Sequence, residues 1–333
     1  MGSPTVVPQG GRPAARRLRP SKRPVDSVTY SQKGGYQGVS VDKQRRLVDL
    51  GWGQVSYLEW LPDCEPKAEV LLLHGGGVDC AELSWGGVGP ALAGAGYRVI
   101  APDHPGYGES ALASWTATQE RLVCYVGEFV DRLGLRDYVI GGLSLAGGMT
   151  IGHLLGQPPR VRGAILLGSY GLMDHQLEGP FKRPAHLLTW VLLRTGVLRR
   201  LTDSYARDRK KMASALRAIV RNPEARTAEL LDAVMVEAQR VDAAVAFEQW
   251  QFDQFGWAKT RTNYSDQLRS ITIPVLVIHG DHDTGVPVNR ARDAARKLPD
   301  ARLLVVPDAG HWVQRDRPAV VLRAILDFLA EPV

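Results

Sequence analysis

The sequence predicts an α/β protein in which a mostly parallel, eight-stranded sheet is flanked by helices and carries an inserted helical cap. Short apolar segments alternate with helical segments along most of the chain, which is typical of a parallel sheet covered on both faces. Segments such as 70–73 (Val-Leu-Leu-Leu) and 275–278 (Val-Leu-Val-Ile) are apolar throughout, as expected of strands buried on both sides. Residues 171–265 break the alternation, because they contain helical patterns without an obvious strand.

The expected strands form an initial hairpin followed by six further strands. In chain order they are 46–50, 54–61, 70–73, 97–101, 138–140, 161–167, 275–278 and 303–306. The helices expected between and after them are 87–95, 117–133, 145–156, 288–297 and 316–330. The chain is therefore divided into a basic N-terminal extension (1–40), a first core part (41–170), a cap or lid insertion (171–265) and a second core part (266–333).

The first 40 residues are rich in Pro, Gly, Arg and Ser and hold few large apolar side chains, which predicts a flexible extension. Residues 1–46 carry ten Lys/Arg against Asp26 and Asp42, a net charge of +8 within a total of +6. Since the excess positive charge belongs to this tail, we expect no nucleic-acid partner. The extension is either a solvated tail or a contact for an anionic partner.

The chain has no apolar run of the roughly 18 residues that a membrane-spanning helix needs, and no continuous apolar segment typical of a signal peptide. Its three cysteines, Cys64, Cys80 and Cys124, show neither CxxC spacing nor a neighbouring pair of histidines. We therefore expect a cytoplasmic protein without a membrane span, a metal or another cofactor. Whether it forms a homodimer is left open.

The expected cap contains a second basic stretch. Residues 182–221 hold eleven Lys/Arg against only Asp203 and Asp208, a net charge of +9. The ordinary interpretation is a solvated helix face. The alternative is a positive potential near the mouth of a site, which would attract an anionic small molecule or a membrane surface.

The strongest local motif is Gly-Gly-Leu-Ser-Leu-Ala-Gly-Gly at 141–148, which directly follows an expected strand and opens an expected helix. A sharp turn between a strand and a helix lifts Ser144 clear of the backbone, and it requires small residues two positions to either side. Gly142 and Ala146 meet this requirement. The motif therefore predicts that Ser144 is a nucleophile.

A serine hydroxyl needs a base and an orienting carboxylate to act as a nucleophile near neutral pH. Two later loops supply them, each at the carboxyl end of an expected strand. Asp283 lies in the stretch His-Gly-Asp-His-Asp-Thr-Gly-Val-Pro at 279–287, and His311 lies in Asp-Ala-Gly-His-Trp-Val-Gln at 308–314. The predicted catalytic set is therefore Ser144, Asp283 and His311.

Two further motifs complete a resemblance to a known family. His-Gly-Gly-Gly at 74–77 and Asp-His-Pro-Gly-Tyr-Gly-Glu-Ser at 103–110 follow consecutive strands, and with the three loops above they resemble the α/β-hydrolase superfamily. The resemblance covers roughly residues 45–332 and implies the α/β-hydrolase fold. It also implies that Asp283 is the acid, with Asp281 as the alternative.

Acyl transfer builds negative charge on a carbonyl oxygen, and each backbone donor aimed at that oxygen contributes about 100- to 1,000-fold in rate. The expected donors of this oxyanion hole are the amide of Leu145 and that of Gly76, with Gly77 as the alternative. Aromatic residues Trp312, Trp250 and Phe247 are candidates for the substrate pocket, although aromatic residues at helical spacing more often pack between cap and core.

The reaction is narrowed by the identity of the nucleophile. Superfamily members that are dehalogenases and epoxide hydrolases imply an aspartate at the turn, so Ser144 favours an ester, thioester, amide or carbon–carbon bond. The first hypothesis is a serine hydrolase of a carboxylic ester or lactone. The glycine run and the pair His311-Trp312 also resemble hydrolases of dienol-keto ring-fission products, which gives the second. A binding or templating protein on the same fold is the third.

Overall fold

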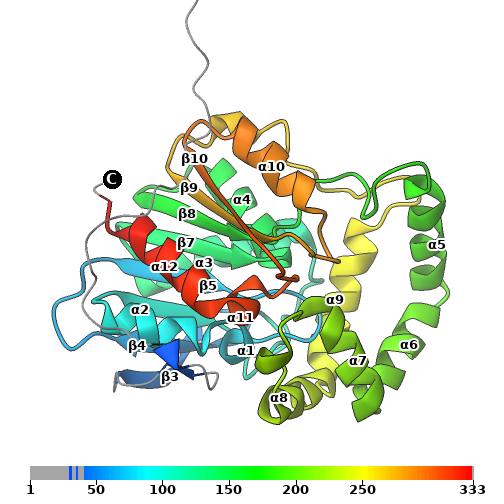
Figure 1. Ribbon diagram of the computed structural model, residues 1–333, viewed down its shortest axis with the longest axis horizontal. Helices are drawn as coiled ribbons and strands as arrows, with labels where there is room; N and C mark the ends of the chain where they lie inside the picture. Colours follow the sequence, from blue (N-terminus) through cyan, green and yellow to red (C-terminus); the bar gives the residue numbers. More distant parts are fainter. Residues whose placement is uncertain (1–29, 32–34, 37–40, 332–333) are drawn as a thin grey trace, which may run out of the picture.

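The computed structural model describes residues 30–31, 35–36 and 41–331 of the chain, and an eight-stranded sheet forms its centre (Figure 1). The strand order is β10-β9-β8-β7-β5-β6-β4-β3. The strands are β3 (Asp42–Asp49), β4 (Gln54–Leu61), β5 (Glu69–Leu73), β6 (Arg98–Pro102), β7 (Tyr138–Leu143), β8 (Val161–Leu167), β9 (Val275–Gly280) and β10 (Ala301–Val306).

The strands from β5 to β10 run parallel, and the hairpin of β3 and β4 joins them antiparallel to β6. This confirms the predicted α/β-hydrolase sheet, including its hairpin start. Since all six parallel strands point the same way, their carboxyl ends meet at one edge, where open α/β sheets bind ligands. The predicted catalytic residues and the glycine run lie at this edge, directly after β5, β7, β9 and β10.

Helices cover both faces of the sheet (Figure 1). They are α1 (Ala81–Trp85), α2 (Val88–Gly94), α11 (Val313–Asp316) and α12 (Pro318–Leu329) on one face, and α3 (Gln119–Leu133), α4 (Leu145–Leu155) and α10 (Val288–Lys297) on the other. Trp60 and Trp85 anchor the first core layer, and Tyr125 and Phe129 anchor the second. Burial of an apolar side chain such as that of Phe129 contributes about 1.5–3 kcal/mol.

Local signals explain where α3 begins and ends. The Thr118 hydroxyl accepts a hydrogen bond from the Arg121 amide, so it satisfies a donor of the first turn that has no partner within the helix. Gly134 ends the helix with a φ of 64°, in the left-handed region that favours glycine. Between these ends, α3 buries Leu122, Val126 and other apolar residues against the sheet.

Five helices fill the segment between β8 and β9, and they are called the cap helices below. They are α5 (Lys182–Arg194), α6 (Val197–Ala206), α7 (Arg209–Ile219), α8 (Ala228–Ala238) and α9 (Val241–Gln254), with a short 3-10 turn at Pro223–Ala225. Figure 1 shows them beyond the sheet, with α5 and α6 at the outer border of the molecule and α9 next to the body.

The structure differs from the sequence-based expectations in some local features. Helix α1 was not expected, because its five residues are too few to show a helical period. The helix expected at 316–330 is present as α12, which begins at Pro318 because proline is favoured in the first helical turn, where its missing amide donor costs nothing, and the short helix α11 before it was not expected. A further 3-10 turn spans Leu268–Ser270.

The predicted flexible extension, residues 1–40, lies largely outside the described residues. Its described pieces are β1 (Tyr30–Ser31) and β2 (Gly35–Tyr36), which pair antiparallel. Across the described ranges, every helix is too short or too polar to cross a bilayer.

Candidate active site

Ser144 lies at the turn between β7 and α4. Its backbone has φ 54° and ψ −118°, which is uncommon for a residue with a side chain and costs about 1–3 kcal/mol. A Cβ atom added at Gly142 would lie 2.2 Å from the Ala146 carbonyl oxygen, so a larger residue would collide with the first turn of α4. The Ser144 amide donates to the Leu167 carbonyl over 2.9 Å, which ties the turn to the end of β8.

His311 and Asp283 meet at the carboxyl edge of the sheet. Nδ1 of the imidazole lies 2.8 Å from Oδ2 of Asp283 and 2.9 Å from Oδ1. The carboxylate also accepts the amides of Gly285 at 2.7 Å and Val286 at 2.9 Å. These donors fix the carboxylate, so the orientation of the imidazole is set before any ligand binds.

The electrostatics of this pair favour an ionised carboxylate. Burial would raise the pKa of Asp283, but the neighbouring imidazoles of His311 and His279 overcome it and hold this pKa well below its usual range. Burial alone would lower the pKa of His311. The negative charge of the Asp283 carboxylate outweighs burial, so the pKa of His311 is raised above its usual value. An imidazole oriented by a buried anion can accept a proton from a hydroxyl.

The alternative acid, Asp281, points elsewhere. Its Oδ1 lies 2.7 Å from Nδ1 of His282, on a partly exposed part of the loop. The structure therefore brings Asp283, and not Asp281, to His311. His279, near the end of β9, packs beside the pair, with its Nε2 3.2 Å from Oδ2 of Asp283 and 2.9 Å from the Val286 carbonyl.

Gly168, at the end of β8, brings the Asp283–His311 pair close to the nucleophile turn. A Cβ atom added at Gly168 would lie 3.0 Å from Oδ2 of Asp283 and 3.2 Å from Nδ1 of His311. The carbonyl of the preceding residue, Leu167, accepts a hydrogen bond from the Ser144 amide. Within the described residues, no hydrogen bond joins the Ser144 hydroxyl to the imidazole. Such bonds are often long in ligand-free enzymes and shorten in the substrate complex.

The glycine loop after β5 lies directly beside Ser144. A Cβ atom at Gly75 would be 3.5 Å from the Ser144 Cβ, and one at Gly76 would be 2.9 Å from Cδ1 of Leu145. The structure therefore brings Gly76 close to the side chain of Leu145, the other residue from which an amide donor is expected. Gly77, the alternative, has a φ of +73°, a conformation that a residue with a side chain adopts only under strain.

Two buried histidines hold the base of this loop in place. The His74 ring accepts the His104 amide through Nε2 at 2.9 Å, and its Nδ1 contacts the Gly75 carbonyl at 2.8 Å. Burial lowers the pKa of His74 to about 3, so the ring is neutral at physiological pH. His104 in turn contacts the His74 carbonyl, so both rings support the loop.

Asp79 is a residue of the site that was not predicted from the sequence. Its carboxyl group is buried and accepts the Gly75 amide at 2.7 Å, the Cys80 amide at 2.8 Å and the Ser84 hydroxyl at 2.7 Å. Burial raises the pKa of Asp79 to about 7, although these hydrogen bonds act in the opposite direction. An acid two residues after the glycine run was the only available signal.

A cavity of about 440 Å³ opens between this loop and the cap helices. Its mostly apolar lining includes Gly76, His311 and residues of α6 to α9. Phe247 and Trp312 line it, as the sequence predicted. Trp250 does not: it lies behind Phe247, stacked on that ring with centroids 5.7 Å apart, and buries its indole N–H against Gln119. A helical period cannot tell which aromatic residue faces a cavity.

The charged groups that line the cavity are mostly paired with one another. Arg199 lies 3.0 Å from Glu248. Arg240 lies 2.8 Å from Glu237. Burial raises the pKa of Glu237, and the neighbouring guanidinium counteracts it. Since the lining also includes Asp203, acidic side chains outnumber arginines three to two.

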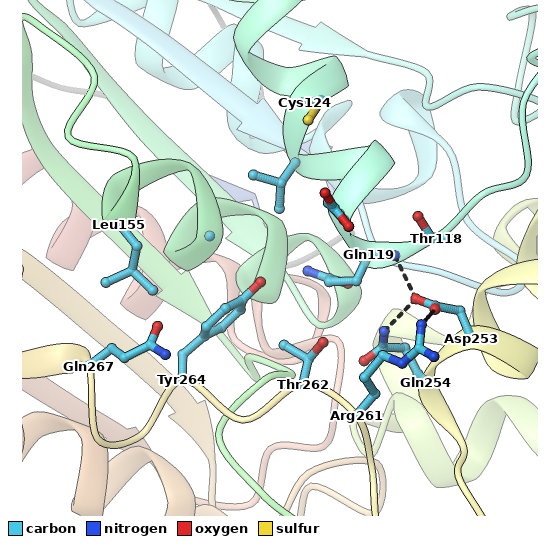
Figure 2. Close-up of a pocket in the computed structure, with 13 residues that line it drawn as sticks. Thr118, Gln119, Cys124, Leu155, Asp253, Gln254, Arg261, Thr262, Tyr264 and Gln267 are labelled. Atoms are coloured by element: carbon cyan, nitrogen blue, oxygen red, sulfur yellow. Dashed lines mark hydrogen bonds and ion pairs between the residues drawn. The ribbon is translucent and has the colours of Figure 1, made fainter.

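A second hollow of about 440 Å³ lies between α3, α4 and the loop after α9 (Figure 2). Its polar centre is Asp253, which accepts the Gln119 amide at 2.9 Å and the Gln254 side chain at 2.7 Å and pairs with Arg261. Because Gln119 also holds Trp250, this hollow marks the junction that fixes α9 to the body. None of the predicted site residues lines it. The described residues also contain no cluster of ligands suited to a metal ion.

Comparison with known proteins agrees with this arrangement. A family model described as "alpha/beta hydrolase fold" matches residues 69–318. The chain is 30% identical to 2-hydroxy-6-oxo-6-(2'-aminophenyl)hexa-2,4-dienoic acid hydrolase of Metapseudomonas resinovorans, over 86% of this chain and 90% of that protein. It is also 30% identical to 2-hydroxy-6-oxo-6-phenylhexa-2,4-dienoate hydrolase of Burkholderia cepacia, over 81% and 90%.

A solved structure shows the same similarity in three dimensions. The crystal structure of a serine hydrolase involved in carbazole degradation superimposes with a TM-score of 0.69 at 26% identity. The match covers 87% of this chain and 99% of that one. The similarity therefore includes the cap segment as well as the sheet.

Proposed function

Because the chain belongs to the α/β-hydrolase fold family and is a hydrolase, we propose that it cleaves the carbon–carbon bond beside the ketone of a 2-hydroxy-6-oxo-dienoate. In this proposal Ser144 is the nucleophile, His311 the general base and Asp283 the residue that orients it. The observation that carries the catalytic part is the Asp283–His311 pair, 2.8 Å apart, beside a strained serine turn. The choice of bond is supported by relatives named for such compounds.

The proposed chemistry has two stages. The Ser144 oxygen attacks the ketone carbon at position 6, and His311 takes the hydroxyl proton. The substrate enters this step as its 2,6-dioxo tautomer, in which the proton of the 2-hydroxyl group has moved to carbon 5. The bond between carbons 5 and 6 then breaks, its electron pair delocalises through the C3–C4 double bond onto the oxygen at carbon 2, and His311 returns the proton to that oxygen. Water activated by His311 then hydrolyses the acyl-enzyme, which releases a carboxylic acid and restores the serine.

Charge on the former ketone oxygen is stabilised by backbone donors in this proposal. The amides of Gly76 and Leu145 lie on adjacent segments beside Ser144, and the first turn of α4 adds its helix dipole. Phe247 packs over the glycine loop, since a Cβ atom at Gly76 would lie 2.7 Å from its ring. This packing excludes water from the side of the loop that faces the cap.

The direct experiment is turnover of 2-hydroxy-6-oxo-6-phenylhexa-2,4-dienoate, followed by loss of its visible absorbance, in parallel with a series of aryl esters. The proposal predicts a higher kcat/KM for the dienoate than for any ester, and loss of both activities in Ser144→Ala. If the protein hydrolysed esters but did not cleave the dienoate, the proposed carbon–carbon bond would be wrong, whereas the assignment of the protein as a hydrolase would stand.

A second candidate is hydrolysis of an uncharged ester or lactone, with the same three residues in the same roles. It is favoured by the pairing inside the cavity, where Arg199 and Arg240 already have carboxylate partners. A dienoate carries its own carboxylate, which would have to displace one of these partners. Competition between an uncharged lactone and the dienoate for the enzyme separates the two candidates.

We also propose a cytoplasmic location. Support comes from Cys64, Cys80 and Cys124, which are all free thiols in the structure. Exposed thiols such as Cys64 and Cys124 persist most readily in a reducing compartment. Alkylation of the protein in intact cells with and without a reductant tests this proposal, since an exported protein would show oxidised cysteines.

A further inference from the structure

Exposed apolar side chains are concentrated on one part of the surface. Within the described residues there are thirteen large hydrophobic residues with exposed side chains, and eight of them lie between positions 177 and 205. They are Leu177, Phe181, Leu187, Leu188, Val191, Val197, Leu201 and Tyr205. Scattered exposed apolar residues are normal, but a contiguous group of this kind marks an interaction surface.

These residues follow the outer faces of two neighbouring helices. On α5, Leu187, Leu188 and Val191 are exposed on the face opposite the buried His186 and Leu193. On α6, Val197, Leu201 and Tyr205 recur every four residues and form one stripe, and no residue of this helix is buried. The two helices pack against each other and form the outer border of the molecule (Figure 1).

Aromatic side chains extend the same surface. Phe181, directly before α5, is 73% exposed, and Trp257, in the loop after α9, is 71% exposed. The Trp257 loop is joined to α5, because His186 contacts the Gly256 carbonyl at 2.8 Å. Aromatic rings at such positions are typical of proteins that rest at the boundary between lipid and water. The outer face of α5 and α6, with Phe181 and Trp257, is called the apolar cap face below.

Positive charge surrounds the apolar cap face. Lys182 and Arg183 begin α5, and Arg200 and Arg207 flank the stripe on α6. Within the described residues none of these four cations forms an ion pair with a carboxylate, in contrast to Arg199, which pairs with Glu248. Apolar side chains rimmed by free cations are complementary to an anionic lipid surface.

We propose that the apolar cap face docks on the surface of a bilayer that contains anionic phospholipids. A second copy of the chain suits this face less well, because a two-fold contact would bring the same rows of cations against each other. The N-terminal extension has the same charge sign as the rim, with ten Lys/Arg in residues 1–46. An anionic bilayer supplies both the apolar interior and the counter-charge.

Docking in this way would connect the bilayer with the cavity. Tyr205 and Leu198 of α6 belong to the cavity lining, and Tyr205 also belongs to the exposed stripe. Helix α6 would then lie between lipid and cavity, so an uncharged ester or lactone dissolved in the bilayer, the substrate of the second candidate function, could reach the cavity without crossing water. Only this consequence depends on the proposed function, whereas docking itself does not.

The test is co-sedimentation of the full chain with phosphatidylcholine vesicles that contain 0 or 30% phosphatidylglycerol, at low and high salt. We expect binding to the anionic vesicles that weakens with salt. Leu188→Asp combined with Leu201→Asp should lower the partition coefficient at least tenfold. The matched control is Val320→Asp, which alters an exposed valine of α12 on the body and should bind like the wild type.

Several outcomes would overturn the proposal. One is equal binding of the double variant and the wild type, which would assign membrane affinity to another basic segment such as residues 1–46. Another is a wild-type dimer, seen by light scattering, that the double variant dissociates, because the face would then be an interface between two copies. Ser144→Ala should bind vesicles like the wild type, so failure of the proposed activity leaves this test unaffected.

Discussion

The carboxylate of Asp79 accepts the backbone amide of Gly75 over 2.7 Å, so a buried acid holds the glycine loop against the nucleophile turn. The same carboxylate raises the pKa of His311, which places its charge within reach of the proposed base. Asp79 is therefore a positioning residue whose protonation affects both the loop and the imidazole.

The protonation of Asp79 should make the free energy of unfolding depend on pH. Burial raises its pKa to about 7 in the folded protein, above the value of 3.8 for an unperturbed aspartate. The folded state therefore binds more protons between about pH 4 and pH 7, and stability falls as the pH rises through this window. Urea unfolding of the wild type and Asp79→Asn at several pH values checks this. The wild type should lose stability relative to the variant across this window, and parallel curves would contradict the assignment.

Asp79→Asn should also change the pH profile of catalysis. Removing the carboxylate charge lowers the pKa of His311, so the acid limb of kcat/KM should move to lower pH. A purely structural role would lower kcat/KM without moving this limb. The profile is measured with an ester substrate whose own groups do not titrate in the range.

Substitution of the two loop aspartates should give opposite results. Asp283→Asn removes the charge that orients His311 and is expected to lower kcat about 10,000-fold. Asp281→Asn should leave kcat within a few-fold of the wild type, because Asp281 contacts His282 and not His311. Steady-state kinetics of both variants provides the comparison. A large loss in Asp281→Asn alone would refute the placement of the acid.

The glycine loop should not tolerate a methyl group at position 76. Gly76→Ala would place its Cβ 2.7 Å from Phe247 and 2.9 Å from Leu145, so the loop must shift away from its position beside Ser144. We expect kcat/KM to fall at least tenfold while the melting temperature changes little. The matched control is Gly53→Ala, whose Cβ meets only Ala111 at 3.8 Å and should leave the activity unchanged.

The charge pairs of the cavity should control preference for anionic substrates. Glu248→Gln leaves Arg199 without its carboxylate partner at the cavity wall. We expect the ratio of kcat/KM for an anionic substrate to that for an uncharged ester to rise about tenfold, from the gain of roughly one charge-assisted contact. Asp266→Asn, which alters an exposed pair outside the cavity, serves as the control. An unchanged ratio would show that substrates do not approach Arg199.

Much of the fold could be predicted because its signals are local. The strands from β4 to β10 are short runs rich in apolar residues, so the fold class and the succession of strands along the chain follow from sequence. The first strand was expected only at 46–50, because the preceding part of β3, from Asp42, is polar. Helix α1 could not be predicted in this way, since five residues contain little more than one turn.

The candidate site was partly predictable for the same reason. Ser144 and His311 have distinctive neighbours, but Asp281 and Asp283 differ only in which of them reaches His311. Asp79 depends on how the chain folds back onto Gly75. Trp250 and Phe247 share one helix, and only the packing of α9 against Gln119 decides which of them faces the cavity.

The central claim is that His311, oriented by Asp283, activates Ser144. The most direct test is the reaction of the protein with a fluorophosphonate at several pH values between roughly 5 and 9. Intact-mass and peptide mass spectrometry measure the rate and the site of labelling. The account predicts a single adduct on Ser144, formed faster as His311 loses its proton and absent from Ser144→Ala. A wild-type protein that stays unmodified, or a Ser144→Ala variant labelled at the same rate, would contradict it.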